Sequence, residues 1–336
     1  MDAMLISVVI PAYHSKKTIK KTISSICREL GSDILYEVIV VENGPEDGTR
    51  QVIEALAGHM PYIRLYHSVQ GVSNARNEGM MHASGKWLMF VDADDELHPG
   101  SGKRLIEVMQ TSEADVCLFG HQSGEKRRPV CSESEFYTGS EIEAVRIRML
   151  EAPTRYMQVW AKLFRRQQVV AAGVLFEPEL SMAEDSDFTF QYTAFCRSAA
   201  FYPDIVYDYH INPVSVMHAF DAQKVEAYIR AMTVMTERMS GESEAIQCAC
   251  DQYILAHFHI AMVNGVFCTG NDVFCGEKVR RIRDTAGHPV FKKAIRRVSL
   301  KSGGWISRVT GLLLKGHLYG LLGVVYTLRV WQKRKR

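Results

Sequence analysis

Two carboxylates with the spacing for metal chemistry stand in Asp92-Ala93-Asp94, directly after the apolar run 87–91. Alternate side chains of an extended chain point to the same side, so Asp92 and Asp94 are expected to face one way. Such carboxylates repel each other unless a cation joins them, and Mg²⁺ or Mn²⁺ held by few protein ligands also grips a diphosphate. The pair therefore predicts a divalent-metal site. Its alternative is a solvated acidic turn that caps the helix expected near residue 101.

A second acidic pair, Glu184 and Asp185, precedes an aromatic helical pattern at 188–192. A carboxylate at this point can take the proton from an acceptor hydroxyl, which is the work of a general base. The alternative is plain acidity at a helix start, which the helix macrodipole favours. Both interpretations stay open when this pair is considered alone.

The elements that must position these residues alternate regularly over about residues 1–120. The expected strands are 5–10, 36–41, 63–67, 87–91 and 115–119, and the expected helices are 15–30, 49–57, 72–83 and 101–110. Strands that are apolar throughout and alternate with helices predict an α/β domain, with a mostly parallel sheet covered on both faces. Ligands bind beyond the carboxyl ends of such strands. We therefore expect three segments at one rim: Pro11-Ala12-Tyr13, Glu42-Asn43-Gly44 and Asp92-Ala93-Asp94.

The alternation breaks after about residue 120. Residues 121–140 are polar and mixed, two aromatic-rich stretches follow at 160–164 and 188–192, and the pattern from 221 to 297 is helical. This change predicts a helical C-terminal region after the α/β part.

Composition excludes several classes of protein. The 336 residues are 47% hydrophobic and 23% charged, as in an ordinary globular protein, and a formal net charge of +2 gives no chain-wide basic field for nucleic acid. The 8 cysteines form no disulfide framework, and no signal peptide precedes them. We expect a reduced, cytoplasmic compartment.

Six segments resemble, in order, those of the family 2 glycosyltransferases, which have the GT-A fold. They are Ser7-Val8-Val9-Ile10-Pro11-Ala12-Tyr13, Val40-Val41-Glu42-Asn43-Gly44-Pro45-Glu46-Asp47-Gly48-Thr49, Gly71-Val72-Ser73-Asn74-Ala75-Arg76-Asn77-Glu78-Gly79, Phe90-Val91-Asp92-Ala93-Asp94-Asp95, Trp160-Ala161-Lys162-Leu163-Phe164 and Glu184-Asp185. Each segment alone is weakly specific, but six in the family's order are highly specific. The resemblance covers about residues 4–220.

The resemblance implies a nucleotide diphosphate sugar as donor, with UDP favoured, and a role for each matching residue. The residues implied at the donor are Pro11, Ala12, Tyr13, Glu42, Asn43, Arg76, Asp92 and Ala93. Asp94 is implied as the ligand of Mn²⁺ or Mg²⁺, with His218 as a second candidate, and Asp185, beside Glu184, is implied as the base of an inverting single displacement. Glu42-Asn43 replaces the family's commoner Asp-Asp pair, yet the Asn43 amide keeps a donor and an acceptor for a uracil-like edge.

The resemblance, which covers residues up to about 220, and the sequence pattern beyond them divide the chain into four parts. Residues 1–120 are the nucleotide-sugar-binding half of the GT-A domain and residues 121–220 its acceptor-binding half. A helical region at 221–300 and a basic amphipathic segment at 301–336 follow.

The last segment predicts contact with a membrane. Its apolar series from 312 to 331 is interrupted by Lys315, His317 and Arg329, and the uninterrupted part, 318–328, is shorter than the roughly 20 residues of a spanning helix. A helix lying in the interface would place Tyr326 and Trp331 at the headgroups and the cations of 333–336 against anionic lipid on the inner face of the cell membrane. This suits a lipid-linked or envelope glycan as acceptor. The alternative is a helix packed on the catalytic domain with a solvated basic tail.

Two rival functions remain at this stage. A sugar nucleotidyltransferase opens with a Gly-rich basic loop after its first strand, whereas here the strand runs into Pro11-Ala12-Tyr13-His14. A catalytically inactive glycosyltransferase-like partner in a membrane assembly is the other rival, and two intact acidic sites count against it.

Overall fold

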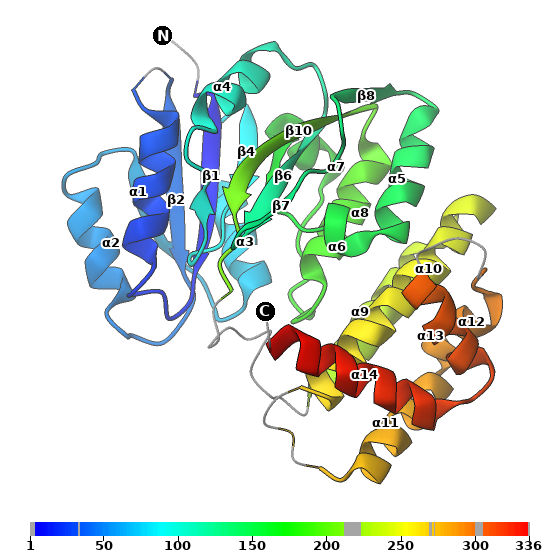
Figure 1. Cartoon of the computed structure of the whole chain (residues 1–336). Helices are drawn as coiled ribbons and strands as arrows, with labels where there is room; N and C mark the ends of the chain where they lie inside the picture. The colour runs from blue at the N-terminus through cyan, green and yellow to red at the C-terminus, as the bar shows by residue number, and fades with distance from the viewer. Residues whose placement is uncertain are drawn as a thin grey trace. The chain divides into compact units, whose positions relative to one another are not determined.

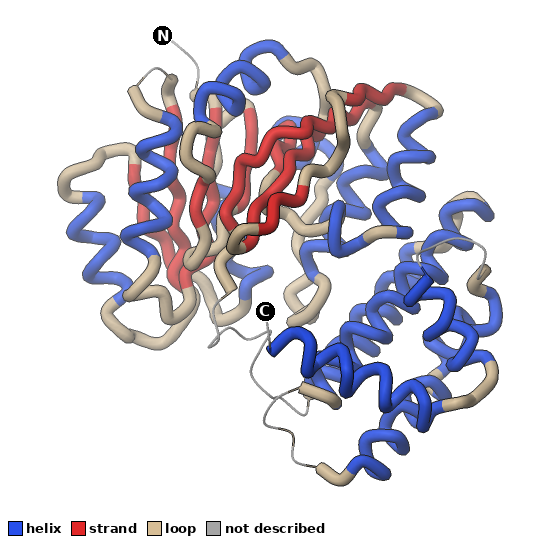
Figure 2. Tube along the Cα trace, viewed as in Figure 1, coloured by secondary structure: helices blue, strands red, loops and turns tan. Residues whose placement is uncertain are grey.

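The computed structural model describes residues 4–32, 34–211, 223–268, 271, 273–299 and 305–334. The chain forms two compact units, residues 1–145 with 154–211 and residues 146–153 with 212–336. Figure 1 labels the helices and strands, and Figure 2 shows that the strands lie in the first unit while the second is helical. The helical C-terminal region predicted from the sequence is confirmed in the described residues.

The first unit is built on one mixed sheet, which has ten strands in the described residues. The strands are β1 (Ile6–Ala12), β2 (Tyr36–Glu42), β3 (Ile63–His67), β4 (Trp87–Phe90), β5 (Glu96–Leu97), β6 (Val116–Ser123), β7 (Lys126–Arg128), β8 (Glu135–Thr138), β9 (Lys162–Arg165) and β10 (Ser198–Asp208). Their order is β3-β2-β1-β4-β9-β6-β10-β5, with β7 beside β6 and β8 beside β10. The pairs among β1 to β4 are parallel, and β9 runs antiparallel to both β4 and β6.

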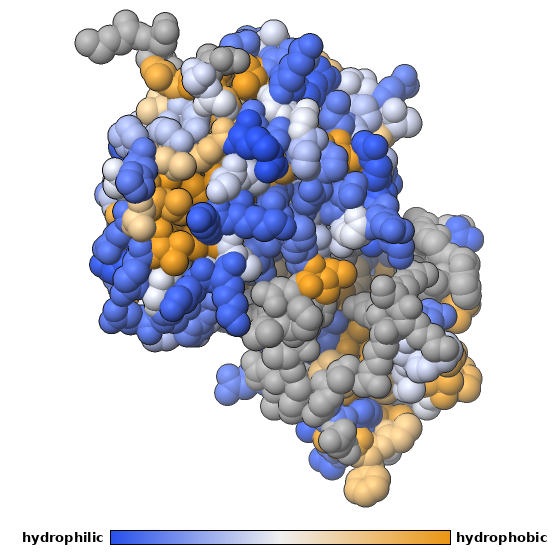
Figure 3. Space-filling model, turned by 60° about the vertical axis from the view of Figure 1, so that its left-hand side comes forward, coloured by the Kyte–Doolittle hydropathy of each residue, from blue (hydrophilic) through white to orange (hydrophobic). Residues whose placement is uncertain are grey.

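Helices cover both faces of this sheet, as the apolar strands predict. The helices before residue 196 are α1 (Ile19–Leu30), α2 (Thr49–Ala57), α3 (Val72–His82), α4 (Gly102–Thr111), α5 (Glu141–Glu151), α6 (Pro153–Tyr156), α7 (Arg166–Ala172) and α8 (Glu184–Phe195). The buried side chains of α1 and α4 join Val8 and Ile10 in one core. On the opposite face α3 approaches Val9 so closely that a Cβ at Gly79 would lie 2.3 Å from Val9 Cγ1. Hydrophilic side chains dominate the face of this unit seen in Figure 3.

The structure corrects the expected ends of two strands. Pro11 and Ala12 belong to β1, and Glu42 belongs to β2, whereas the sequence placed all three beyond the strands. Proline is tolerated here because β1 pairs with β4 only as far as Val9, so the missing N–H of Pro11 removes no bond to β4. Tyr13 and Asn43 are therefore the residues that follow the strands.

The second unit consists of α9 (Lys224–Arg238), α10 (Glu244–Ala261), a π-helical turn (Met262–Val266), α11 (Cys275–Gly287), α12 (Pro289–Arg297), α13 (Trp305–Lys315) and α14 (Tyr319–Arg334). None of the helices in the described ranges is both long and apolar enough to cross a membrane. One expectation is wrong: Tyr326 is 1% exposed, and its hydroxyl lies 2.6 Å from His259 Nδ1, so it is not available to lipid headgroups. Tyr326 belongs to the apolar face of α14 that packs inward.

Candidate active site

The carboxyl ends of β1, β2 and β4 meet at one edge of the sheet because these neighbouring strands are parallel. Ala12 and Glu42 are partners in the register of β1 and β2. The backbone N–H of Asn43 donates to the Ala12 carbonyl at 3.1 Å, which extends the ladder by one residue past β2. Each of the three segments that the sequence predicts at a common rim therefore either forms the end of one of these adjacent strands or follows directly after it.

Tyr13 and Asn43 give this rim an aromatic side chain and an unsatisfied amide. The Tyr13 side chain is 41% exposed, and its ring packs on the backbone of Gly44, where a Cβ would lie 2.8 Å from Tyr13 Cδ2. The Asn43 side chain is buried, and its Oδ1 has no hydrogen-bond partner among the described residues. A buried acceptor without a donor is costly, so a ligand that supplies an N–H to Asn43 would be favoured.

The carboxylate of Glu42 is already engaged within the protein. It is buried, and its Oε2 lies 3.0 Å from Arg50 Nε and 2.9 Å from Arg50 Nη2. The ion pair joins the end of β2 to α2. Glu42 therefore stabilises the rim from inside the fold.

Arg76, from α3, links the two acidic groups that the sequence singled out separately. It is 3% exposed, and its guanidinium lies 3.0 Å from Asp92 Oδ1 and 2.9 Å from Glu184 Oε1. Its Cζ lies 5.2 Å from the centre of the Phe176 ring, in cation–π geometry. Burial opposes its charge, but Asp92 and Glu184 outweigh that effect and raise the pKa of Arg76. Asp92 and Glu184 are thus joined by a cation of the protein itself, the Arg76 guanidinium.

Burial alternates along Asp92-Ala93-Asp94-Asp95, although the backbone forms a turn here, closed by the Asp95 N–H that donates to the Asp92 carbonyl at 3.1 Å, and not the extended chain expected from the sequence. Asp92 and Asp94 are partly exposed, whereas Ala93 and Asp95 are buried. Asp92 and Asp94 therefore share the accessible side of this segment, and Asp95 turns into the protein.

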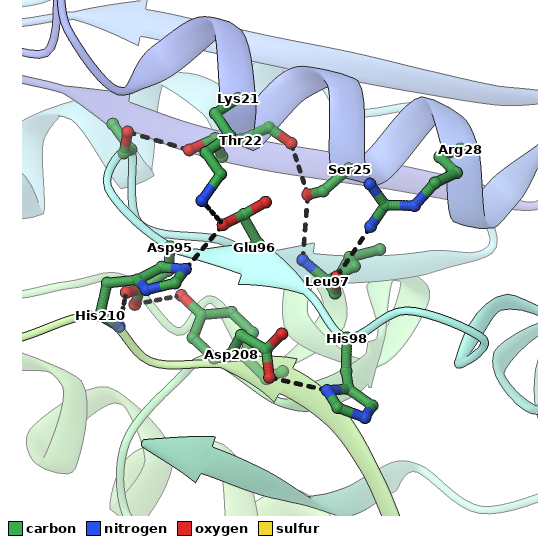
Figure 4. A network of polar contacts seen from close by, with 12 residues as sticks. Lys21, Thr22, Ser25, Arg28, Asp95, Glu96, Leu97, His98, Asp208 and His210 are labelled. Atoms are coloured by element: carbon green, nitrogen blue, oxygen red, sulfur yellow. Dashed lines mark hydrogen bonds and ion pairs between the residues drawn. The ribbon is translucent and has the colours of Figure 1, made fainter. Parts of the chain in front are cut away.

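Asp95 anchors the acidic segment to the end of β10, a role that the sequence did not reveal. Its carboxylate accepts the Tyr207 hydroxyl at 2.8 Å and the backbone N–H of His210 at 2.7 Å (Figure 4). The N–H of Asp92 donates to the Tyr207 hydroxyl oxygen at 3.1 Å, and Thr22 of α1 donates to the Ala93 carbonyl at 3.0 Å. Burial and the charge of Asp92 raise the pKa of Asp95 to about 9. Contacts from the end of β10 and from α1 thus fix the position of the acidic segment.

The residues at this rim fit a divalent ion that is shared with a phosphate ligand. Within the described ranges no three His, Cys, Asp or Glu side chains cluster to hold a metal, and Asp92 is engaged by Arg76. Asp94 offers a carboxylate on the accessible side, and Mg²⁺ commonly takes one or two carboxylates together with water and substrate phosphates. His218, the second candidate ligand, lies outside the described residues.

Asp185 is the second residue of α8, whose N-cap is a strained residue. Ala183, at the N-cap, has φ 59°, a left-handed conformation that is uncommon for a residue with a Cβ. The Asp185 side chain is partly exposed, and its Oδ1 accepts the N–H of Ser186 at 3.1 Å. Burial and the neighbouring charge of Glu184 raise its pKa to about 7, although the Arg76 cation opposes them. Among the two acidic residues, Glu184 is held by Arg76 and Asp185 is the one with a base-like pKa.

Lys162 is a further charged residue near this site, and sequence reasoning assigned it no role. It is 1% exposed and begins β9 in the middle of the sheet. Burial lowers its pKa to about 7, and the charge of Asp185 acts in the opposite direction. The only sequence signal was its place in the segment Trp160-Ala161-Lys162-Leu163-Phe164.

Comparison with known proteins defines the class of this fold and site. The sequence model of glycosyl transferase family 2 matches residues 7–170, which contain β1 to β9 and the acidic segment after β4. This match, which spans just under half of the chain, makes the chain similar to that family, and its fold is of the GT-A type, as the six motifs predict. The match favours a glycosyltransferase over a sugar nucleotidyltransferase. Asp185 lies beyond the matched residues.

Individual relatives are similar over different lengths. The glycosyltransferase EpsJ of Bacillus subtilis (strain 168) is 29% identical over 225 residues, 63% of this chain and 62% of EpsJ, so the match spans less than two thirds of that relative. The crystal structure of S. aureus TarS 1-349 in complex with UDP-GlcNAc has a TM-score of 0.68 at 18% identity, covering 99% of this chain and 92% of that chain. The mannosyltransferase PcManGT from Pyrobaculum calidifontis, in complex with GDP-Man and Mn²⁺, has a TM-score of 0.55 at 14% identity, covering 98% and 88%. These two likenesses show the fold alone.

Proposed function

We propose that this glycosyltransferase moves a hexose-type sugar from a UDP-sugar to a hydroxyl of a glycan or lipid-linked acceptor, with inversion. The observation that carries the proposal is the position of Arg76, which joins Asp92 of the nucleotide side to Glu184, the neighbour of Asp185. Through this one buried side chain the donor and acceptor carboxylates form a single site. A single site with a base and a diphosphate-binding edge suits direct displacement.

The chain's residues divide the work between donor and acceptor. Tyr13 and Asn43 border the nucleotide base, Asp92 faces the ribose and sugar, and Asp94 would hold Mn²⁺ or Mg²⁺. When bound, the ion supplies Lewis-acid stabilisation of the leaving diphosphate. Asp185 takes the proton as the acceptor O–H bond breaks, the acceptor oxygen bonds to the anomeric carbon, and the bond from that carbon to the phosphate oxygen breaks. The electron pair of that bond leaves with the nucleoside diphosphate.

The nucleotide base can be tested by calorimetry, because Asn43 offers an unused buried acceptor. Its Oδ1 suits the ring N–H of uracil, and TarS, whose fold is similar, is described with UDP-GlcNAc. With Mn²⁺ present, UDP is expected to bind more tightly than CDP, because the ring nitrogen of cytosine at this position carries no hydrogen. Asn43→Ala should weaken UDP binding by about 1 kcal/mol, or roughly fivefold, and leave CDP binding nearly unchanged. Equal affinities for UDP and CDP in the wild type would exclude a uracil-selective site.

We further propose that the protein works on the inner face of the cell membrane, held there by α14. Four apolar side chains lie three or four residues apart on this helix, and each is more than half exposed: Leu321, Val324, Leu328 and Trp331. The opposite face of the helix packs inward through Leu322 and Tyr326. A helix that is apolar on its exposed face as well favours contact with lipid.

The charge of the surrounding sequence suits an anionic surface. Residues 285–336 contain twelve Lys and Arg residues and neither Asp nor Glu. Each cation near an anionic bilayer contributes about 1 kcal/mol. Binding of nucleic acid would not need an apolar stripe. A basic segment that also carries one therefore favours acidic lipid as the binding partner.

Flotation with vesicles tests the membrane proposal. The double variant Val324→Glu with Leu328→Glu is expected to lose at least about tenfold in affinity for anionic vesicles, since burying each of these side chains is worth about 1.5–3 kcal/mol. Thr327→Glu with Gln332→Glu is the matched control, with the same charge change at exposed positions beside the stripe. Salt should weaken wild-type binding. Equal losses in both double variants, or no wild-type binding at low salt, would contradict the proposal.

A further inference from the structure

Asn77 of α3 holds the backbone of a residue that lies 99 positions further along the chain. Its Nδ2 donates to the Phe176 carbonyl at 2.8 Å, and its Oδ1 accepts the Phe176 N–H at 2.8 Å. One side chain therefore satisfies both polar groups of the Phe176 backbone. Residues 173–183, all of them described, connect α7 to α8 and contain no helix or strand. The paired hydrogen bond thus fixes this connection at a point where no regular structure does.

The Phe176 ring packs on the helix that carries the proposed base. It is fully buried and stacks on Phe188 of α8, with ring centres 4.1 Å apart and an angle of 4° between the planes. Phe90, the last residue of β4, packs edge-on against both rings, at 5.2 and 5.7 Å. Phe188 follows Asp185 on the first turns of α8, and Phe90 closely precedes Asp92. The three rings therefore join the strand before the acidic segment to the start of α8.

The same ring supports Arg76, the chain neighbour of Asn77. The Arg76 Cζ lies 5.2 Å from the centre of the Phe176 ring, and the attraction between a cation and a ring is strongest when both are shielded from water. The Arg76 guanidinium also contacts Asp92 and Glu184. Phe176 thus touches both the cation that links the two carboxylates and the helix on which one of them lies.

The connection to α8 ends at a strained residue. Ala183, directly before Glu184, has φ 59°, a left-handed conformation that persists only where the surrounding structure imposes it. The hydrogen bonds from Asn77 and the stack on Phe188 are contacts by which the rest of the unit holds this connection at Phe176. Such strain is concentrated at functional sites, and here it directly precedes the two acidic residues of α8.

We propose that Asn77 is a positioning residue of the sugar-transfer reaction, which holds Phe176 against Arg76 and α8 and so sets the position of Asp185. The proposal rests on the role of Asp185 in the proposed function. A general base must lie within hydrogen-bond reach of the hydroxyl that it deprotonates, so a small displacement of α8 lowers the rate. Asn77 acts on the base through Phe176.

The test begins with Asn77→Ala, which removes both hydrogen bonds to Phe176. The kcat for transfer should fall about ten- to a hundredfold, the usual cost of misplacing a catalytic group by about 1 Å. The Kd for UDP should stay close to the wild-type value, because Tyr13 and Asn43 directly follow β1 and β2. Gln168→Ala is the matched control: its amide donates to the Phe195 carbonyl at 2.7 Å, at the other end of α8, and its loss should leave kcat unchanged.

The pH profile separates positioning from a general loss of stability. Burial and Glu184 raise the pKa of Asp185 to about 7, and Arg76 is the cation that opposes them. When Phe176 no longer supports Arg76, the acid limb of the kcat–pH profile should move to higher pH. The shift should be smaller than the roughly 1–3 units that a whole opposite charge is worth.

A double variant tests whether Asn77 acts through the Phe176 ring. Phe176→Leu removes the ring and keeps the backbone groups that Asn77 binds, and it should lower kcat and shift the pH profile in the same direction. Asn77→Ala combined with Phe176→Leu should lose little more activity than the worse single variant, because both substitutions break the same link. Rates are compared at a temperature at which thermal unfolding shows every variant to be folded.

The other outcomes would overturn the proposal. These are an unchanged kcat and pH profile in folded Asn77→Ala, a Kd for UDP that weakens as much as kcat falls, and additive losses in the double variant. If Asn77→Ala does not fold, Asn77→Asp keeps the size and the acceptor and removes the donor; if neither folds, the residue is structural and the proposal is refuted. Asp185→Asn is measured in parallel. Wild-type transfer by that variant refutes the base itself, whereas loss of transfer there with an unaffected Asn77→Ala enzyme refutes only the role of Asn77.

Discussion

Replacing Asp185 with asparagine is expected to lower sugar transfer by about 10²–10⁴-fold, the usual contribution of a general base, while the Kd for the nucleotide sugar stays unchanged. The affinity for the donor should not change because the base acts on the acceptor hydroxyl. In the wild type the transfer rate should rise through about pH 7 and level off above it, because burial and Glu184 raise the pKa of Asp185 to about 7 and the base must be ionised. Single-turnover transfer over a pH series and calorimetry with the donor measure the two effects.

The fold of this variant should remain intact. Folding raises the pKa of Asp185, so the ionised carboxylate is disfavoured in the folded state above about pH 7. Asp185→Asn removes that cost and should melt no lower than the wild type at alkaline pH. Asp187→Asn, on the same helical turn, is the matched control and should transfer sugar at close to the wild-type rate. Wild-type transfer by Asp185→Asn would place the base elsewhere, with Glu184 or Asp187 as the next candidate.

Replacing Asp94 with asparagine is expected to lower turnover by at least about 10²-fold at a Mn²⁺ concentration that saturates the wild type, because metal stabilisation of a leaving group is worth several kcal/mol. Chelation of the wild type should have a similar effect and should be reversed by added Mn²⁺ or Mg²⁺. The measurement is nucleoside diphosphate release over a metal titration.

Two further measurements on the Asp94→Asn variant, its thermal stability and its response to chelator, serve as controls. Because Asp94 lies on the accessible side of a segment that Asp95, Tyr207 and Thr22 fix from within, the substitution should leave the fold and Tm unchanged. Its residual activity should not respond to chelator. Full turnover of the wild type in chelator, or of Asp94→Asn at ordinary Mn²⁺, would remove the metal from the mechanism.

The first 120 residues could be predicted well because their strands are apolar and end in turn residues. The range 63–67 agrees with β3 and 49–57 with α2 without change. The later strands were missed for a physical reason: β7 is Lys126–Arg128, and β9 both begins and ends with a cation. β7 is exposed and shows no apolar pattern, and the burial of β9 depends on β4 and β6, which lie far from it in the chain.

The candidate site could be predicted only in its local part. Asp92 and Asp94 do share the accessible side of their segment, but the backbone there is a turn at Ala93 and Asp94 and not the extended chain that the alternation rule assumes. The link from Arg76 to Glu184 joins residues that are 108 positions apart, so it appears only once the chain has folded. The burial of Lys162 is hidden for the same reason.

The spacing of apolar residues alone could not predict which face of the C-terminal helix α14 is exposed. The apolar residues of α14 surround the helix, and the sequence could not indicate which face packs against the protein. Tyr326 packs inward, whereas Trp331 is half-exposed. Only the exposed face can contact a membrane.

The most direct test of the central hypothesis is release of nucleoside diphosphate by the purified full-length protein from a panel of UDP- and GDP-sugars, with and without Mn²⁺. We predict release from at least one UDP-sugar that depends on Mn²⁺ and is lost in both Asp94→Asn and Asp185→Asn. The same panel with candidate acceptors present should increase the rate, because the acceptor replaces water as the nucleophile. If no nucleotide sugar is turned over with metal and acceptors present, or if both variants release nucleotide at the wild-type rate, the protein does not use this site for sugar transfer, and a non-catalytic role in assembly becomes the better interpretation.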